Sequence, residues 1–181
     1  MALAKPNELL VAAAAVAMEL EAAGFQPVLV GGMALVLLGS QRVTKDYDFL
    51  VTVAGPPIDT IVDAMYRRNL ELVTKFTPEK EVLRSIDNVR VAVSKIKGEQ
   101  PGNLTFYNWT SKLRIDFLLD FPVPARELVQ RSVKVSVGEG HIRIAAHEDL
   151  VRLKKIARAD RDSLSDAQDL EFLERIKRKP G

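Results

Sequence analysis

Two aspartates, Asp46 and Asp48, begin a run that otherwise has the alternating pattern of a β-strand, DYDFLVTV over residues 46–53. Side chains two residues apart leave the same face of a strand, with Cα atoms about 6.5 to 7 Å apart. Tyr47 and Phe49 then leave the opposite face, toward a hydrophobic core. Two carboxylates on one face repel each other unless a cation lies between them. The pair therefore indicates a site for a hard divalent ion, and a solvated strand face is the alternative.

A third carboxylate, Asp116, stands in the apolar run 113–119, which also has the character of a strand. A charge in such a strand is costly to bury without a partner. If this strand lies beside the strand with the aspartate pair, three carboxylates converge, and such a cluster suits two metal ions about 3.5 to 4 Å apart. The alternative is that Asp116 pairs with a basic neighbour such as Arg114 or Lys112.

A glycine pair, Gly31 and Gly32, separates a short predicted strand at 26–30 from a short predicted helix at 33–38. A turn of this kind exposes backbone N–H groups and a helix N-terminus, and both suit phosphate oxygens. An anion-binding turn and a metal-binding carboxylate cluster together describe a nucleoside triphosphate held for in-line attack at phosphorus. Plain turn geometry is the alternative for the glycine pair.

Length and composition restrict the remaining possibilities. The chain has 181 residues, 47% of them hydrophobic and 28% charged, which fits one globular domain with or without a helical appendage. The sequence has no cysteine and only two histidines, so thiolate sites and cysteine nucleophiles are excluded and a zinc site is not expected. A net charge of +2 is too small to indicate a nucleic-acid partner by itself. The apolar stretch 9–17 is shorter than the roughly 18 to 20 residues of a membrane span, so we expect a cytoplasmic protein without a membrane partner.

The order of predicted elements favours an α+β (α/β) fold, with a mixed sheet flanked by helices and a C-terminal helical cap. We expect a core domain over 1–145, with a helical insertion at about 77–103, and a C-terminal helical segment over 146–181 packed on the core. Further predicted helices cover 7–23, 58–69, 126–131, 148–159 and 165–177, and further predicted strands cover 70–76, 104–107, 133–137 and 141–144.

The helical insertion is predicted from a start signal and from a periodicity. Thr77 and Pro78 are suited to the cap and the first position of a helix. Apolar residues then recur at spacings of four, three, four and three, at Val82, Ile86, Val89, Val93 and Ile96. This pattern favours one long helix that ends near Gly98, although residues 89–93 taken alone fit a strand.

Two aromatic residues, Tyr107 and Trp109, stand close to a predicted turn. Aromatic side chains beside a nucleotide site can stack on bases. They are also large contributors to a hydrophobic core. We expect burial in the core here, with base stacking as the alternative.

The order of glycine pair, thirteen residues, D-x-D and a later aspartate on an apolar strand resembles the DNA polymerase β-type nucleotidyltransferase superfamily. The local match is closer to its AbiEii-type branch, whose members share a GG-x-A-L … R-x-T-x-D-x-D run. The matching residues are Gly31, Gly32, Ala34, Leu35, Arg42, Thr44, Asp46 and Asp48, followed by Glu148, Asp149, Leu150 and Lys154 of a second motif and Asp166 and Asp169 of a third. The resemblance extends over residues 8–174. It implies a nucleotidyltransferase-type mixed sheet.

The resemblance also implies roles for these residues. Asp46 and Asp48 would bind Mg²⁺ or Mn²⁺, and Asp116 would bind metal or accept the proton of the attacking hydroxyl. The implied nucleotide contacts are Gly31 and Gly32 with the triphosphate, Lys154 with the phosphates, and Arg42 and Thr44 with the nucleotide. Two positions depart from the family pattern: Gly32 replaces a serine that is common in related members, and Ser165 replaces the lysine of the third motif. A solvated position on an amphipathic helix is the alternative for Lys154.

The function that the resemblance implies is a Mg²⁺-dependent nucleotidyltransferase. It would transfer a nucleoside monophosphate from an NTP such as ATP to a hydroxyl group of RNA, protein or a small molecule, with release of pyrophosphate. Members of this branch often belong to toxin–antitoxin pairs, so tRNA and a cognate toxin or antitoxin protein are possible partners. The alternatives are a non-catalytic binding module of the same fold, acting through a protein or RNA partner, and a metal-dependent hydrolase.

Overall fold

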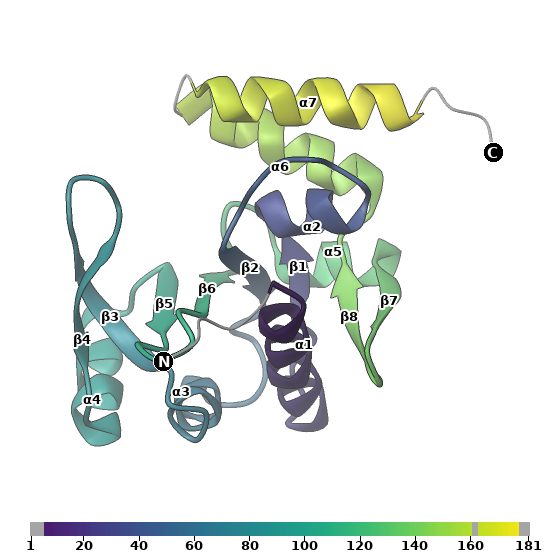
Figure 1. Cartoon of the computed structure of the whole chain (residues 1–181). Helices are drawn as coiled ribbons and strands as arrows, with labels where there is room; N and C mark the ends of the chain where they lie inside the picture. Colours follow the sequence, from purple (N-terminus) through teal and green to yellow (C-terminus); the bar gives the residue numbers. More distant parts are fainter. Residues whose placement is uncertain (1–5, 161–162, 178–181) are drawn as a thin grey trace.

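One mixed sheet of eight strands organises the computed structural model of the protein, which describes residues 6–160 and 163–177 (Figure 1). Its strand order is β4-β3-β5-β6-β2-β1-β8-β7. The strands are β1 (Val28–Val30), β2 (Asp46–Val51), β3 (Glu71–Phe76), β4 (Val82–Ile86), β5 (Asn103–Tyr107), β6 (Arg114–Leu119), β7 (Val133–Val137) and β8 (Gly140–Ile144). Two pairs, β2 with β6 and β1 with β8, are parallel, and the other pairs are antiparallel. This mixed sheet with its helices confirms the predicted α+β fold.

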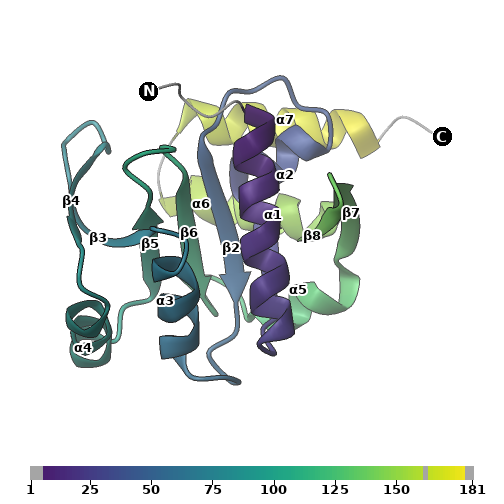
Figure 2. The same cartoon turned by 60° about the horizontal axis from the view of Figure 1, so that its bottom comes forward.

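Helices cover the sheet on one face and at one end. The helices are α1 (Pro6–Ala22), α2 (Gly31–Leu37), α3 (Ile58–Tyr66), α4 (Val89–Glu99), α5 (Ala125–Arg131), α6 (His147–Asp160) and α7 (Leu164–Lys177). Figure 2 shows α1 and α3 lying across the same face of the sheet. The C-terminal helices α6 and α7 pack on each other beyond the end of the sheet at which α2 begins, and α6 also contacts α2.

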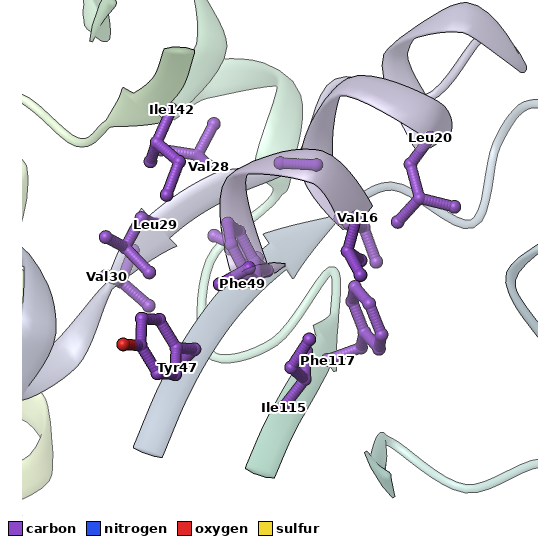
Figure 3. Packing of buried hydrophobic residues seen from close by; sticks show 14 of the residues in the cluster. Val16, Leu20, Val28, Leu29, Val30, Tyr47, Phe49, Ile115, Phe117 and Ile142 are labelled. Atoms are coloured by element: carbon purple, nitrogen blue, oxygen red, sulfur yellow. The ribbon is translucent and has the colours of Figure 1, made fainter. Parts of the chain in front are cut away.

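The core lies between the central strands and α1. Phe49 of β2 stacks on Phe117 of β6, with ring centroids 6.1 Å apart, and both side chains are fully buried. Val16 and Leu20 of α1 lie on the same side of the sheet (Figure 3). Because strand side chains alternate between faces, the burial of Phe49 leaves the neighbouring Asp48 on the opposite face. The predicted strand with one apolar and one acidic face is confirmed.

The predicted helix over 77–97 is wrong, because this segment contains the strand β4 before the shorter helix α4. A spacing of four residues fits the period of a strand as well as that of a helix, so the apolar pattern does not separate the two. Two local signals decide the outcome. The Thr77 hydroxyl accepts a hydrogen bond from the N–H of Glu81 and helps to close the β3–β4 turn, and the Asn88 side chain caps the start of α4.

The helical part of the expected insertion is therefore confined to α4, which packs on α3 and β4. The two predicted C-terminal helices are confirmed as α6 and α7, while 161–162 and 178–181 lie outside the described residues. Over 6–160 and 163–177, none of the helices combines the length and the apolar character that crossing a bilayer requires.

Candidate active site

The register of two parallel strands brings Asp48 and Asp116 side by side. Asp48 of β2 is paired with Asp116 of β6, and Asp46 is paired with Arg114. Neighbouring strands lie about 4.8 Å apart, and paired residues point to the same face. The three acidic residues singled out in the sequence therefore share the face of the sheet opposite α1, on two neighbouring strands.

Arg114 lies among these carboxylates. Its Nη2 is 3.1 Å from Oδ2 of Asp116, and its Nε is 3.8 Å from Oδ1 of Asp46. Asp116 also accepts a hydrogen bond from the Thr105 hydroxyl on β5. Within the described ranges, no group of three or more acidic or imidazole side chains is arranged to hold an ion as it stands. The sequence left open the pairing of Asp116 with a basic neighbour, and the structure contains this pairing, with Arg114 as the partner.

Asp48 is the least compensated of the three carboxylates. Burial raises its pKa to about 7, and the negative charges of Asp116 and Asp46 act in the same direction. Arg114 and Lys154 lower its pKa, but in the described part of the chain no residue forms a hydrogen bond with its carboxylate. Burial also raises the pKa of Asp116, against the opposing effects of its bonds to Thr105 and Arg114. The site is consequently a place of concentrated, poorly neutralised negative charge.

The glycine turn closes directly over Asp48. Gly31 has a φ of +66°, which side chains rarely adopt, and a Cβ atom there would lie 3.0 Å from the Asp48 Cγ and closer still to Oδ2. A residue without a side chain is therefore required on two independent grounds. The turn therefore lies directly against one of the carboxylates.

Arg42 lies beside the second glycine, and Lys154 shares its carboxylate partner Asp169. A Cβ on Gly32 would come within 2.9 Å of Cζ of Arg42, so this guanidinium packs against the turn. Arg42 forms an ion pair with Asp169 of α7, and Lys154 of α6 lies 2.7 Å from the same carboxylate. Lys154 also donates to Asp166, at 3.0 Å. The cations expected to contact a nucleotide are thus held near the turn by two buried carboxylates of α7.

Thr105 contacts the acidic cluster and was not predicted from the sequence, whereas Asp149 and Thr44 were. Thr105, the hydroxyl partner of Asp116, stands in a predicted strand between Leu104 and Phe106, which are buried. A polar residue between two buried apolar ones was the signal that could have identified it. Asp149 of the second motif is buried and paired with Arg131, so its contact is structural. Thr44 lies half-buried in the segment between α2 and β2.

The expected burial of the aromatic pair is wrong for one of its members. Trp109 keeps 42% of its surface exposed, whereas Tyr107 is half-buried. The indole lies on the turn after β5, where the Asn108 side chain accepts the N–H groups of residues 110 and 111. This turn lifts Trp109 out of the sheet, which a pattern of apolar residues does not reveal.

Comparison with known structures places the fold in a class. An antigenic nucleotidyltransferase-like protein from Paracoccidioides brasiliensis has a similar structure, with a TM-score of 0.57 and 14% identity over 95% of this chain and 78% of that chain. At this identity the similarity establishes the fold alone. No protein-family model matches the sequence, and no curated protein matches it. The chain therefore has a nucleotidyltransferase-like fold, and the AbiEii-type resemblance stays a prediction.

The chemistry of the acidic cluster fits a hard divalent cation. Carboxylate oxygens are the ligands that Mg²⁺ and Mn²⁺ prefer. The pKa of Asp48 is raised first by burial and then by the charges of Asp116 and Asp46, and a bound cation would favour its ionised form. Arg114 competes with a cation for the oxygens of Asp46 and Asp116, so binding of an ion requires this guanidinium to move aside.

We predict that the contact between Gly31 and Asp48 can be isolated with two alanine variants. Gly39 also has a positive φ, of +97°, but a Cβ atom there would meet nothing within 4 Å beyond its chain neighbours, so Gly39→Ala should cost only backbone strain, about 1 to 2 kcal/mol. Gly31→Ala should lower the free energy of unfolding by about 1 to 3 kcal/mol more, because Asp48 must shift. Urea unfolding measures both, and equal losses would contradict the close approach.

We also predict a pH dependence of stability that Asp48 causes. Between its ordinary pKa of 3.8 and its folded pKa of about 7, the folded state holds a proton that the unfolded state releases. The free energy of unfolding should therefore fall as the pH rises through this range. Asn cannot titrate, so in EDTA the stability of Asp48→Asn should improve relative to the wild type as the pH rises. A difference that does not change with pH would contradict the raised pKa.

Proposed function

We propose that this protein is a metal-dependent nucleotidyltransferase that transfers a nucleoside monophosphate from an NTP to a hydroxyl acceptor. The observation that carries the proposal is the pairing of Asp48 with Asp116 directly beneath the Gly31 turn. The nucleotidyltransferase-like fold supports this proposal by analogy, while the residues of the site carry it, because one fold can host many functions.

The acidic cluster is suited to hold Mg²⁺ or Mn²⁺ through Asp46, Asp48 and Asp116. A bound ion would neutralise phosphate charge and make the α-phosphorus more electrophilic. Asp116 would either serve as a ligand of the ion or receive the proton of the acceptor hydroxyl, and burial raises its pKa in the direction that favours proton acceptance. Thr105 holds that carboxylate in place through its hydrogen bond.

The transfer is a single in-line displacement. The acceptor oxygen attacks the α-phosphorus and forms a new P–O bond, while the bond from the α-phosphorus to the bridging oxygen of the β-phosphate breaks. Pyrophosphate leaves with that electron pair, and the hydroxyl proton passes to a carboxylate. No oxidant or reductant is required.

The triphosphate is assigned to the glycine turn and its two cations. The absence of a side chain at Gly31 lets the turn approach the Asp48 carboxylate closely, so backbone N–H groups of the turn would be offered to phosphate oxygens beside the acidic cluster. Arg42 lies next to this turn and Lys154 shares Asp169 with it, so phosphate oxygens would compete with Asp169 for both cations. We assign RNA, including tRNA, a protein or a small molecule as the class of acceptor, and a role in a toxin–antitoxin pair belongs to the same proposal.

A non-catalytic module of the same fold is the second candidate. The observation that favours it is the guanidinium of Arg114, which already neutralises two of the three carboxylates. Such a module would bind its partner without needing a metal ion at this cluster.

Label transfer distinguishes the two candidates. Purified protein with Mg²⁺ or Mn²⁺ is offered each α-labelled NTP with total RNA and soluble protein from its host. We expect wild type to label one acceptor band, and Asp46→Ala/Asp48→Ala to reduce the label by at least about a hundredfold, since it removes two of the charged ligands. Asp63→Ala, an exposed carboxylate on α3, is the matched control and should retain full transfer.

The contradicting results are equally specific. Transfer that survives the double substitution would show that these carboxylates are not the site. Calorimetry that detects no binding of NTP with Mg²⁺, together with no transfer, would favour the non-catalytic module.

A further inference from the structure

The face of the sheet that carries the carboxylates continues from β6 onto β5 and β3. Arg114 of β6 is paired with Tyr107 of β5, and Tyr107 is paired with Glu71 of β3. Paired residues share a face, so Tyr107 lies on the same face as Asp46 and two strands away from it. At about 4.8 Å per strand, the aromatic ring starts about 10 Å from the carboxylates.

Three aromatic side chains, Phe76, Tyr107 and Trp109, gather at this place, and we call them the aromatic platform. The rings of Tyr107 and Trp109 meet edge to face, with centroids 5.1 Å apart. Phe76 and Trp109 expose 37% and 42% of their surfaces. The indole N–H of Trp109 donates to the Ser85 hydroxyl on β4, at 2.8 Å, which fixes the ring in place. An ordered and exposed aromatic group loses little conformational entropy when a ligand stacks on it.

Cations lie against the same rings. Nζ of Lys112 is 5.7 Å from the centroid of Trp109 and 6.0 Å from that of Tyr107. The guanidinium of Arg114 is 4.9 Å from the ring centroid of Phe76. Arg114 also contacts Asp116, so the platform and the acidic cluster share one side chain and form a continuous surface.

Aromatic rings combined with neighbouring cations match the chemistry of an unpaired polynucleotide strand. Every base offers a flat face for stacking, and each phosphate offers a negative charge. A double helix keeps its bases stacked inside and does not offer these faces. In the β3–β4 hairpin, Glu71, Glu79 and Glu81 balance Lys75, Lys80 and Arg84. Stacking should therefore contribute more than net charge, and the salt dependence of binding should be shallow.

We propose that the aromatic platform binds the unpaired end of a single-stranded polynucleotide and positions its terminal hydroxyl at the acidic cluster. This inference rests on the proposed function for the identity of the reaction, but the binding itself requires neither NTP nor metal. Trp109 is a positioning residue in this arrangement, and Lys112 supports it through the phosphate next to the stacked base.

The sole tryptophan of the chain reports directly on stacking. We titrate the full-length protein in EDTA with short single-stranded RNA, single-stranded DNA and the corresponding duplex, and follow tryptophan fluorescence. We expect saturable quenching by the single strands and little by the duplex. Lys112→Ala should weaken binding about fivefold, while Lys134→Ala, on the edge strand β7 at the other end of the sheet, should leave it unchanged.

Anisotropy of a labelled strand tests the tryptophan itself. Trp109→Ala should weaken binding on the order of tenfold or more, and Trp109→Phe, which keeps a ring, should stay within about threefold of the wild type. Circular dichroism checks that both variants fold. Absence of quenching, equal quenching by the duplex, or equal affinity of the Trp109→Ala variant would each overturn the platform.

The failures of the two proposals are distinguishable. Strand binding that depends on Trp109, in a protein that transfers no label, supports the platform and counts against the nucleotidyltransferase. Label transfer to a protein or a small molecule that is unaffected by Trp109→Ala supports the nucleotidyltransferase and overturns the platform as its acceptor site.

Discussion

Repulsion between the carboxylates of Asp48 and Asp116, on neighbouring strands, is the unfavourable interaction that the surrounding structure must offset. The register of β2 and β6 places Asp48 beside Asp116, and the packing of Phe49 against Phe117 on the other face fixes that register. A slip of one residue would bury the aspartates and expose the aromatic rings, so the core enforces the repulsion. Arg114 offsets part of this charge, while Asp48 keeps a raised pKa.

A second charge network joins the C-terminal helices to this centre. Asp169 of α7 binds both Arg42, which packs on the glycine turn, and Lys154 of α6. The buried carboxylates of Asp166 and Asp169 are stabilised because cations form ion pairs with them. The positive charge of Lys154 reaches Asp48 and lowers its pKa, so the two networks are electrostatically linked. The helices α6 and α7 are therefore coupled electrostatically to the candidate site.

The sequence predicted the local structure correctly where a single physical cause determined it. Alternation of acidic and apolar residues predicted β2 correctly, and the glycine pair predicted the break between β1 and α2. Periodicity failed at β4, because a spacing of four fits both strand and helix. The contacts of Arg42 and Lys154 with α7 were beyond local reasoning, since they depend on long-range packing. The exposure of Trp109 likewise depends on a turn whose geometry is set by the Asn108 side chain.

Binding of Mn²⁺ to the protein without nucleotide, followed by the loss of the free-ion signal in electron paramagnetic resonance, tests the central claim most directly. If the three carboxylates form a cation site, the wild type binds Mn²⁺ and Asp48→Asn weakens binding by about tenfold or more, because one charged ligand is lost. Asp63→Asn on α3 leaves binding unchanged. Equal binding by the wild type and Asp48→Asn, or none by either, would contradict the account.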